Sequence, residues 1–394
     1  MKIAISGAGV AGPALAHWLL RAGHEPTLIE RAPALRTGGY MIDFWGVGYD
    51  VAERMGLLPE ILETGYRFQE VRLLDRRGRR AGGFSADVFV KATKGRFTSL
   101  PRGDLAAILY RSVEGRAETL FDETIEGLEE GPDAVQVRLR RGGTRRFDLV
   151  VGADGLHSAV RGLAFGPQQG FEVQLGYRVA SFAIQGYRPR DELTYIGAAA
   201  PGRQMARIAL RGDWTMVLLV FPADLIPGEE PEDTPGRQAL LRQVFGDAGW
   251  EAPQLLAAMD EADSLYYDRV SQIHMPAWTK GRIALVGDAA AAVSLMAGEG
   301  TGLGMTEAYV LAGELHRAGG DHAAAFQRYE ARLRPFIQAK QKAARGFAAS
   351  FAPRTATGVW FRNQVSKLLA LPGVARLLIG QTVHDDFELP EYGL

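Results

Sequence analysis

The chain opens with a glycine-rich turn that joins an apolar strand to a helix. Residues 3–5 are apolar, Gly7-Ala8-Gly9-Val10-Ala11-Gly12 follows them, a helical stretch covers 13–21, and a β-rich run at 27–29 ends at Glu30. In such a unit the three glycines permit a tight turn, close approach of a pyrophosphate, and close packing of the helix on the strand. The helix N-terminus favours phosphates, and an acid at the end of the second strand binds the ribose. The opening segment therefore predicts a Rossmann-type dinucleotide site.

Two more apolar strands end in a glycine and an acid. One, at 149–151, runs into Gly152-Ala153-Asp154-Gly155, and the other, at 283–286, runs into Gly287-Asp288. Ligands of an open parallel sheet collect at the carboxyl ends of its strands, so we expect the three strand ends to converge on one elongated ligand. The carboxylates would accept hydrogen bonds from sugar or ribityl hydroxyls, while the glycines let the ligand approach.

The charge balance and the residue types of the chain exclude several functions. The 45 Lys and Arg residues nearly equal the 46 Asp and Glu residues, so we do not expect wholesale nucleic-acid binding. Because the chain has no Cys, disulfides, thiolate metal sites and iron–sulfur clusters are excluded, and the spacing of His157, His274 and His384 predicts no metal site. The apolar opening is too short for a signal peptide, and the stretch 283–305 is too polar for a membrane span. We expect a cytoplasmic monomer or homodimer with a solvated acidic tail at 385–388.

The middle of the chain has a different pattern. Apolar and polar residues alternate there, as is typical of an antiparallel sheet, in runs at 177–184, 193–197, 205–210 and 214–221. We therefore predict an α/β fold in which a Rossmann-like, parallel-sheet dinucleotide domain at 1–170 and 271–320 is interrupted by an antiparallel-sheet substrate domain at 171–270. Short strands near 70–97 are assigned to the first domain as a β excursion. The last part, 321–394, is predicted to be a C-terminal helical segment.

The three strand ends, taken in their order along the chain, resemble the class A FAD-dependent monooxygenases of the p-hydroxybenzoate hydroxylase type. The resemblance covers most of the chain and rests on the opening glycine motif with Glu30-Arg31, on Asp154-Gly155-Leu156-His157-Ser158-Ala159-Val160-Arg161, on Gly287-Asp288-Ala289-Ala290 and on Gly298-Glu299-Gly300-Thr301-Gly302. Arg102, in Arg102-Gly103-Asp104-Leu105, matches the family's RxxL arginine or is a surface arginine that caps a loop. The resemblance implies that FAD is the dinucleotide and is bound by Gly7, Gly9, Ala11, Gly12, Glu30, Arg31, Arg102, Asp154, Gly155, Gly287, Asp288, Gly298, Gly300, Thr301 and Gly302.

The family pattern also implies a role for each of these segments. The opening motif would hold the ADP half of FAD, with Glu30 on its ribose and Arg31 beside the adenosine, and Asp288 would bind the ribityl chain. Residues 298–302 would bring backbone and a helix start to the isoalloxazine ring, where positive potential stabilises negative charge on the reduced flavin. The segment that begins at Asp154 would touch both FAD and the nicotinamide cofactor.

One complete GxGxxG motif with its acid is present, so NADPH or NADH would have to dock transiently. In the family, the flavin reduced by NAD(P)H reacts with O2 and forms a C4a-hydroperoxide that hydroxylates a small-molecule substrate. The cofactor performs the difficult step and the protein supplies a dry, shaped cavity, which we expect between the two domains. Its apolar and aromatic candidates favour a hydrophobic aromatic or polycyclic substrate, with Arg178 or Arg207 on a phenolate or enolate. The candidate lining residues, any of which could instead pack in the core, are Arg178, Phe182, Tyr195, Met205, Arg207, Met216 and Leu218.

Two parts of the sequence bear on the kind of chemistry. Gly38-Gly39-Tyr40-Met41-Ile42-Asp43 resembles the tetracycline-inactivating and polyketide-tailoring monooxygenases, which are enzymes of antibiotic resistance and biosynthesis. By contrast, Ala291 and Leu295 stand where the family usually has His and Pro. The leading hypothesis is an FAD-dependent, NAD(P)H-consuming monooxygenase. The alternatives are a flavoprotein of the same fold that acts as a non-oxygenating oxidoreductase or as an FAD-scaffolded cyclase, and a non-catalytic ligand-binding protein.

Overall fold

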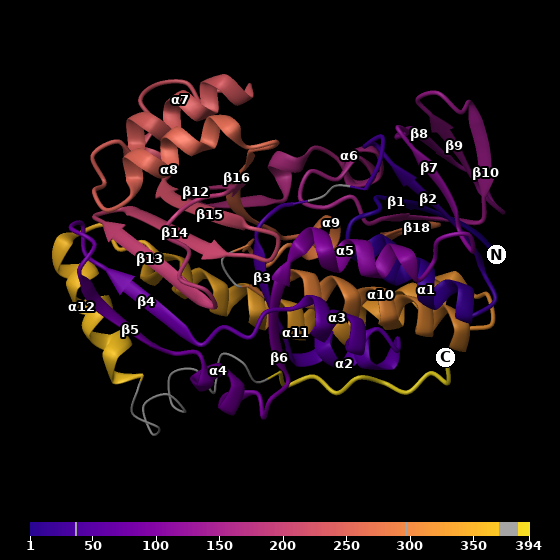
Figure 1. The fold of residues 1–394 in the computed structure, drawn as a ribbon. Coiled ribbons are helices and arrows are strands. Elements are labelled where there is room, and N and C mark those ends of the chain that lie inside the picture. Colours follow the sequence, from indigo (N-terminus) through magenta and orange to yellow (C-terminus); the bar gives the residue numbers. More distant parts are fainter. Residues whose placement is uncertain (36–37, 296–297, 370–384) are drawn as a thin grey trace.

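The computed structural model describes residues 1–35, 38–295, 298–369 and 385–394, and of 346–351 only the backbone (Figure 1). A parallel and an antiparallel sheet form the two halves of the molecule. The long helices α10 (Gly300–Arg317) and α11 (His322–Phe351) pack against each other, and α11 extends from the parallel-sheet half toward the other half (Figure 1). The predicted α/β architecture is thus confirmed.

The parallel sheet contains, in spatial order, β17 (Thr279–Lys280), β18 (Ile283–Leu285), β11 (Leu149–Gly152), β1 (Lys2–Ser6), β2 (Glu25–Glu30) and β7 (Glu118–Phe121). Neighbouring strands are parallel except β17, which is antiparallel to β18. Strands β1, β11 and β18 are buried on both faces, which accounts for their nearly continuous apolar runs. The strand order puts the carboxyl ends of β18, β11, β1 and β2 next to one another.

The second sheet contains, in spatial order, β16 (Tyr266–Ile273), β12 (Glu172–Gln185), β15 (Trp214–Pro222), β14 (Arg203–Ala209), β13 (Thr194–Ala200), β4 (Glu70–Leu74) and β5 (Arg80–Ser85). Its first five strands are antiparallel, and α7 (Thr234–Phe245) and α8 (Ala252–Ala258) form an apolar core with one of its faces.

The β4–β5 hairpin corrects one prediction. Strand β4 pairs in parallel with β13, so the hairpin extends the second sheet and is not an excursion of the first domain. The sequence of a hairpin specifies its own turn, but it does not say which distant sheet edge the hairpin will join. The domain boundaries as a whole stay a prediction.

A two-stranded sheet of β3 (Met41–Trp45) and β6 (Phe97–Pro101) lies between the two halves. Alternate residues of β3 point in opposite directions. Ile42 and Phe44 belong to the core of the parallel-sheet half, whereas Met41 packs with Met216 of the antiparallel sheet. One face of β3 therefore lines the junction between the halves.

Helix α1 packs on α10 and against the parallel sheet. No helix among the described residues is both long and apolar enough to cross a membrane. The remaining elements are α1 (Ala11–Arg21), α2 (Gly46–Arg54), α3 (Leu58–Thr64), α4 (Asp87–Ala92), α5 (Arg102–Arg111), α6 (Ala159–Phe165), α9 (Asp288–Ala291), α12 (Ala356–Leu368), 3-10 helices at Gln168–Gly170, Ala223–Leu225 and Met259–Glu261, and a three-stranded sheet of β8 (Ile125–Glu130), β9 (Val135–Leu139) and β10 (Thr144–Phe147).

Residues 385–394 pack on the body of the protein, so the expectation of a solvated tail at 385–388 is wrong for Asp385 and Phe387, whereas Asp386 and Glu388 are exposed. Phe387 stacks on Phe336 of α11 with 4.9 Å between ring centroids. Tyr392 donates a hydrogen bond of 2.8 Å to Glu314 of α10, and both side chains are buried. The partners are far away in the sequence, which is why the acidic composition of the segment was misleading. His384 lies outside the described residues.

We predict that Tyr392→Phe lowers the free energy of unfolding by about 2 kcal/mol, because it removes a hydrogen bond to the buried, charged Glu314. Thermal unfolding measures the loss. The control is Glu391→Gln, since the Glu391 side chain is 84% exposed in its ion pair with Arg54 and its removal should change stability by less than about 0.5 kcal/mol. Equal shifts in the two variants would contradict the docked arrangement.

Candidate cofactor and substrate site

Backbone contacts shape the loop between β1 and α1. Gly7 has a φ of +103°, and a Cβ on it would lie 2.6 Å from the carbonyl oxygen of Ala153. A Cβ on Gly12 would overlap the carbonyl oxygen of Gly7. At Gly9, a Cβ would lie 3.5 Å from the guanidinium of Arg102. The loop is therefore closed toward the sheet and has a cation beside its middle glycine.

Glu30 ends β2 and lies against the same loop. Its carboxylate accepts hydrogen bonds from the N–H groups of Ala8 and Ala32, each at 2.9 Å. Arg31 follows it and is exposed. The acid thus lies beside the start of α1, where a ribose next to a bound pyrophosphate would need an acceptor.

Asp288 begins α9 directly after β18. The preceding residue, Gly287, has a φ of +63° and donates its N–H to the buried Glu307 carboxylate at 2.6 Å. Burial raises the pKa of Glu307 to about 8. Burial also raises the pKa of Asp288, and the charge of Arg102 opposes that rise. Arg102 therefore lies beside Gly9 and its charge acts on Asp288, an arrangement that suits an extended ligand with phosphates and hydroxyls.

The segment before and at the start of α10 lies beside Asp288. A Cβ on Gly300 would lie 3.7 Å from the Asp288 carboxylate, and Gly298, with a φ of +72°, lies against the ring of Trp45. The Thr301 hydroxyl is buried and has no hydrogen-bond partner among the described residues. An orphaned hydroxyl at a helix N-terminus fits a ligand edge that carries acceptors, such as the carbonyls of a flavin ring. By this observation and the glycine loop, the residues present fit FAD.

Helix α10 packs closely on α2 and α1. A Cβ on Gly48 of α2 would clash with the Cα of Gly302, and a Cβ on Gly304 would be in van der Waals contact with the Cβ of Ala11 in α1 at 3.5 Å. The starts of α1 and α10 are therefore brought together at the same edge of the parallel sheet.

Asp154 follows β11 and is occupied by hydrogen bonds within the protein. Its carboxylate accepts from the hydroxyls of Ser6 at 3.2 Å and Ser158 at 2.5 Å, and from N–H groups in the first turn of α6. It thereby holds the turn at Gly155, whose φ is +80°. Arg161 is completely buried and donates to a carbonyl of α9 at 3.0 Å. The structure thus gives this segment a supporting role, and its contact with a cofactor stays a prediction.

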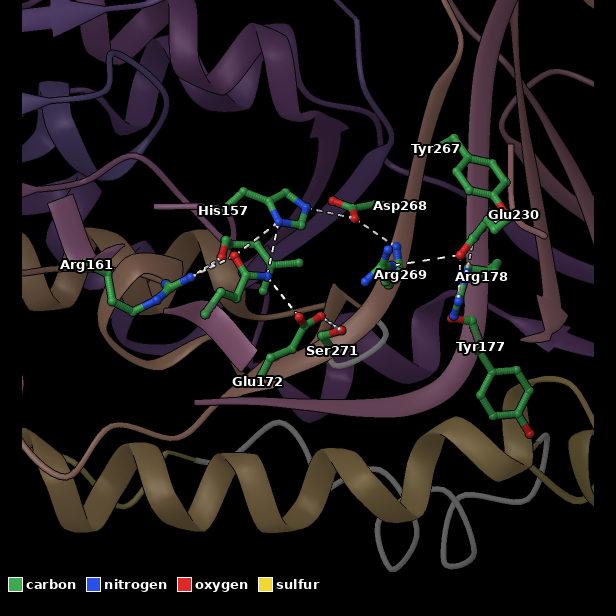
Figure 2. Close-up of polar contacts among 12 residues, drawn as sticks. His157, Arg161, Glu172, Tyr177, Arg178, Glu230, Tyr267, Asp268, Arg269 and Ser271 are labelled. Atoms are coloured by element: carbon green, nitrogen blue, oxygen red, sulfur yellow. Dashed lines mark hydrogen bonds and ion pairs between the residues drawn. The ribbon is translucent and has the colours of Figure 1, made fainter. Parts of the chain in front are cut away.

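His157, in the same segment, connects the two halves of the molecule (Figure 2). Its Nε2 lies 3.1 Å from the Asp268 carboxylate on β16, and its Nδ1 lies 3.3 Å from the side-chain oxygen of Gln168. Gln168 donates to Glu172 at 2.9 Å, and Glu172 also accepts from Ser271 at 2.6 Å. Hydrogen bonding to Asp268 raises the pKa of His157. Within the described part of the chain, no cluster of His, Asp and Glu is arranged to hold a metal ion.

Strand alternation sorts the predicted substrate residues onto two faces of the antiparallel sheet. Phe182 and Met205 pack in the core with α7 and α8. Arg178 and Arg207 lie on the same face, where they form ion pairs of 2.5 and 2.7 Å with glutamates of this half (Figure 2 shows the Arg178 pair). The expectation that these four residues line a substrate cavity is therefore corrected, because the sequence fixes the alternation of a strand but not which face meets the other domain.

Tyr195 and Met216 lie on the opposite face, where they pack with Met41 of β3. Leu218 lies in the neighbouring cluster with Leu295. These three of the predicted residues face the junction between the halves, and their contact with a substrate stays a prediction.

Asp43 and Tyr40 lie at this junction; they belong to the family-like segment 38–43 but were not predicted as site residues. Asp43 shares the face of β3 with Met41 and accepts a hydrogen bond from Ser99. Its side chain has an exposed surface, yet desolvation by the surrounding protein raises its pKa, as expected for a group that lines a recess. The ring of Tyr40 lies 5.4 Å from that of Tyr266 on β16, and burial raises the pKa of Tyr40 to about 12. The alternation within 41–45 was the signal available for Asp43.

Comparisons with known proteins cover the same two halves. A family model described as an FAD binding domain matches residues 1–344. A flavin-dependent monooxygenase from an unknown prokaryotic organism is 33% identical over 100% of this chain and 99% of its own length. One from Legionella longbeachae is 32% identical over 100% of this chain and 98% of its own length. The crystal structure of the tetracycline destructase Tet(55) has a TM-score of 0.83 to this chain at 33% identity, and the match covers 99% of this chain and 98% of that one.

We predict that Asp288→Ala weakens FAD binding by about 10- to 100-fold, because a hydrogen bond to a charged acceptor contributes about 1.5–3 kcal/mol. Fluorescence titration of the apoprotein with FAD gives the dissociation constant. Asp263→Asn is the control, since Asp263 is exposed and outside this site. An unchanged affinity in Asp288→Ala would remove Asp288 from the cofactor site.

We predict that the His157–Asp268 pair stabilises the protein mainly at low pH. Because the pKa of His157 is raised in the folded protein, the contribution is complete below about pH 6.5, the ordinary pKa of His, and is lost as the pH rises through the raised value. The pair is partly exposed, so the contribution is on the order of 0.5 kcal/mol. Melting temperatures of wild type and His157→Gln should differ most at acid pH and converge at alkaline pH, and Asp268→Asn should follow the same course. A difference that is constant with pH would argue against the pair.

Proposed function

The chain belongs to the class A FAD-dependent monooxygenases, and we propose that it uses NADPH or NADH and O2 to hydroxylate a hydrophobic aromatic or polycyclic small molecule. The observation that carries the proposal is that Arg102 lies beside Gly9, and its charge acts on Asp288, next to the junction of the two halves. Arg102 also donates its backbone N–H to the carbonyl of Tyr40 at 3.0 Å, and the ring of Tyr40 lies 5.4 Å from that of Tyr266 at that junction. A cofactor held by Gly9, Arg102 and Asp288 would therefore lie next to the junction.

The protein's part in this reaction is to bind and orient. FAD, when bound, accepts a hydride and activates O2. The start of α1 and Arg102 favour its pyrophosphate, and Asp288 accepts hydrogen bonds from its hydroxyls. The start of α10 supplies positive potential, and Thr301 supplies a hydroxyl, toward the ring. These groups are already in position before a substrate binds, so they need little reorganisation during the reaction.

Apolar surface at the junction supports a hydrophobic substrate. Met41 of β3 faces Tyr195 and Met216 of the antiparallel sheet, and Leu218 lies next to them. Such surfaces exclude water and take up the flat body of an aromatic molecule. The similarity to a tetracycline destructase supports a polycyclic substrate over a single ring.

The number of dinucleotide-binding motifs supports transient docking of NADPH or NADH. The sequence contains one complete GxGxxG motif with its acid, and the residues around it fit FAD. A second dinucleotide would therefore bind without a site of this type and leave after each reduction.

We predict that purified protein carries a visible flavin spectrum and that an added polycyclic probe, tetracycline, stimulates its oxidation of NADPH or NADH. Mass spectrometry of the probe after turnover in isotopically labelled O2 should find one labelled oxygen atom. The control is the same mixture without reductant, in which the mass of the probe should not change. A folded, colourless protein that takes up no FAD would contradict the proposal.

The same experiment distinguishes the proposed monooxygenase from the non-oxygenating alternative. That alternative rests on Ala291 and Leu295, which replace the usual His and Pro of the family. An oxidoreductase or cyclase would convert its substrate without oxygen and without gaining labelled oxygen. A binding protein would retain the probe and leave its mass unchanged.

A further inference from the structure

Glu299 is the residue directly before α10, at the N-cap position of that helix. A side-chain oxygen at this position commonly accepts a hydrogen bond from the first N–H groups of the helix, but the Glu299 carboxylate makes no such bond to the described start of α10. Its Oε2 lies instead 2.8 Å from Nζ of Lys340 in α11. The side chains of Glu299 and Lys340 are 12% and 13% exposed. The carboxylate is therefore held by α11, in a largely buried ion pair, and not by the helix that it precedes.

Asp385 of the C-terminal segment also binds Lys340. Its Oδ1 lies 2.5 Å from Nζ of Lys340, and its Oδ2 accepts a hydrogen bond from the N–H of Val47 at 2.7 Å. Val47 is in the first turn of α2, and the N-cap residue of that helix, Trp45, provides no side-chain hydrogen bond to it. A carboxylate is favoured at a helix N-terminus, so Asp385 is well placed there. The C-terminal segment thus fixes Lys340 relative to α2, and Lys340 fixes Glu299.

The position of the Glu299 carboxylate matters because the start of α10 belongs to the candidate cofactor site. The first N–H groups of a helix have no carbonyl partner within it, and together with the helix dipole they attract anions and acceptors. A Cβ on Gly300 would lie 3.7 Å from the Asp288 carboxylate, and the buried Thr301 hydroxyl has no hydrogen-bond partner among the described residues. A carboxylate that capped α10 would occupy its N–H groups and bring a negative charge to the place where a flavin ring would accept hydrogen bonds.

The ionisation of Glu299 depends on the groups around it. Burial raises the pKa of Glu299 to about 7, although the charge of Lys340 opposes that rise. Burial alone would lower the pKa of Lys340, but the charges of Glu299 and Asp385 raise it. Within the described ranges, Lys340 and Asp385 are the charged groups that act on Glu299, and Asp43 of β3 lines the same recess. Glu299 therefore changes its charge near neutral pH, and Lys340 is the cation that balances it.

We propose that Lys340 is a positioning residue of the cofactor site. It holds the Glu299 carboxylate away from the N-terminus of α10, so that the N–H groups there can bind the flavin ring, and Asp385 holds Lys340 in place. The inference rests on the proposed function, because it takes the ligand at this site to be FAD. It follows that removal of Lys340 harms the site through the released carboxylate of Glu299, and not through lost packing.

The test measures FAD binding by Lys340→Met in two backgrounds, by fluorescence titration of the full-length apoprotein. With Glu299 present, we expect binding about tenfold weaker at alkaline pH, because the ionised carboxylate then competes for the start of α10. The loss should shrink toward about pH 6, where Glu299 is protonated. In a Glu299→Ala background, Lys340→Met should cause no further loss. Lys340→Arg, which keeps the charge, should recover most of the affinity, and Lys342→Met, at an exposed lysine of the same helix, is the matched control.

The FAD-loaded protein gives an independent measurement. A carboxylate beside the ring disfavours the negative charge of the reduced flavin, so Lys340→Met should have a lower flavin midpoint potential than Lys342→Met. Melting temperatures establish that each variant is folded. An unchanged affinity in Lys340→Met would overturn the role of Lys340, as would a loss that is constant with pH or persists in the Glu299→Ala background. A wild type that binds no FAD would overturn the proposed function as well, whereas normal FAD binding without these effects would overturn the role of Lys340 alone.

Discussion

The candidate site depends on backbone contacts at the carboxyl edge of the parallel sheet. A Cβ on Gly7 would strike the strand end at Ala153, and a Cβ on Gly48 would strike Gly302 at the start of α10. Glycine inside a folded segment costs roughly 0.5–1 kcal/mol relative to Ala, and the protein bears this cost where two backbones must touch. Since no side chain separates these elements, strand ends and helix starts approach closely enough to surround a narrow ligand.

The three strand-end acids have different environments despite their similar sequence motifs. Glu30 and Asp154 accept hydrogen bonds from backbone N–H groups, those of Ala8 and Ala32 for Glu30 and those of Ala159 and Val160 for Asp154, so their charges are stabilised by the protein itself. The pKa of Asp288 is instead raised by burial, and the charge of Arg102 opposes that rise. An acid whose charged form is disfavoured by desolvation gains most from hydroxyl donors brought by a ligand. Among the three, Asp288 is therefore the acid best suited to depend on the cofactor.

Local signals in the sequence were sufficient for the parallel half of the fold and insufficient for the junction. Glycine spacing and apolar runs specify strands β1, β11 and β18, because both are short-range properties. The contact between Arg362 and Gln204 could not be predicted, since it joins residues 158 positions apart. The faces of Arg178 and Arg207 were equally hidden, because alternation defines two faces and only the docking of α7 and α8 decides which one is covered.

Leu295 stands where the family usually has proline, and the backbone just before it has a conformation that a proline would not allow. The residue before it, Ser294, is buried and has a φ of +109°. A residue that precedes proline is restricted to a φ of about −120°, so the conformation of Ser294 and a proline at 295 exclude each other. Leu295 packs in the cluster of Leu218 and Tyr266 and gives the junction an apolar wall where a proline would give a rigid turn. The departure from the family is thus a property of the whole loop, because a proline at this position would require Ser294 to move and Leu295 to give up its contacts.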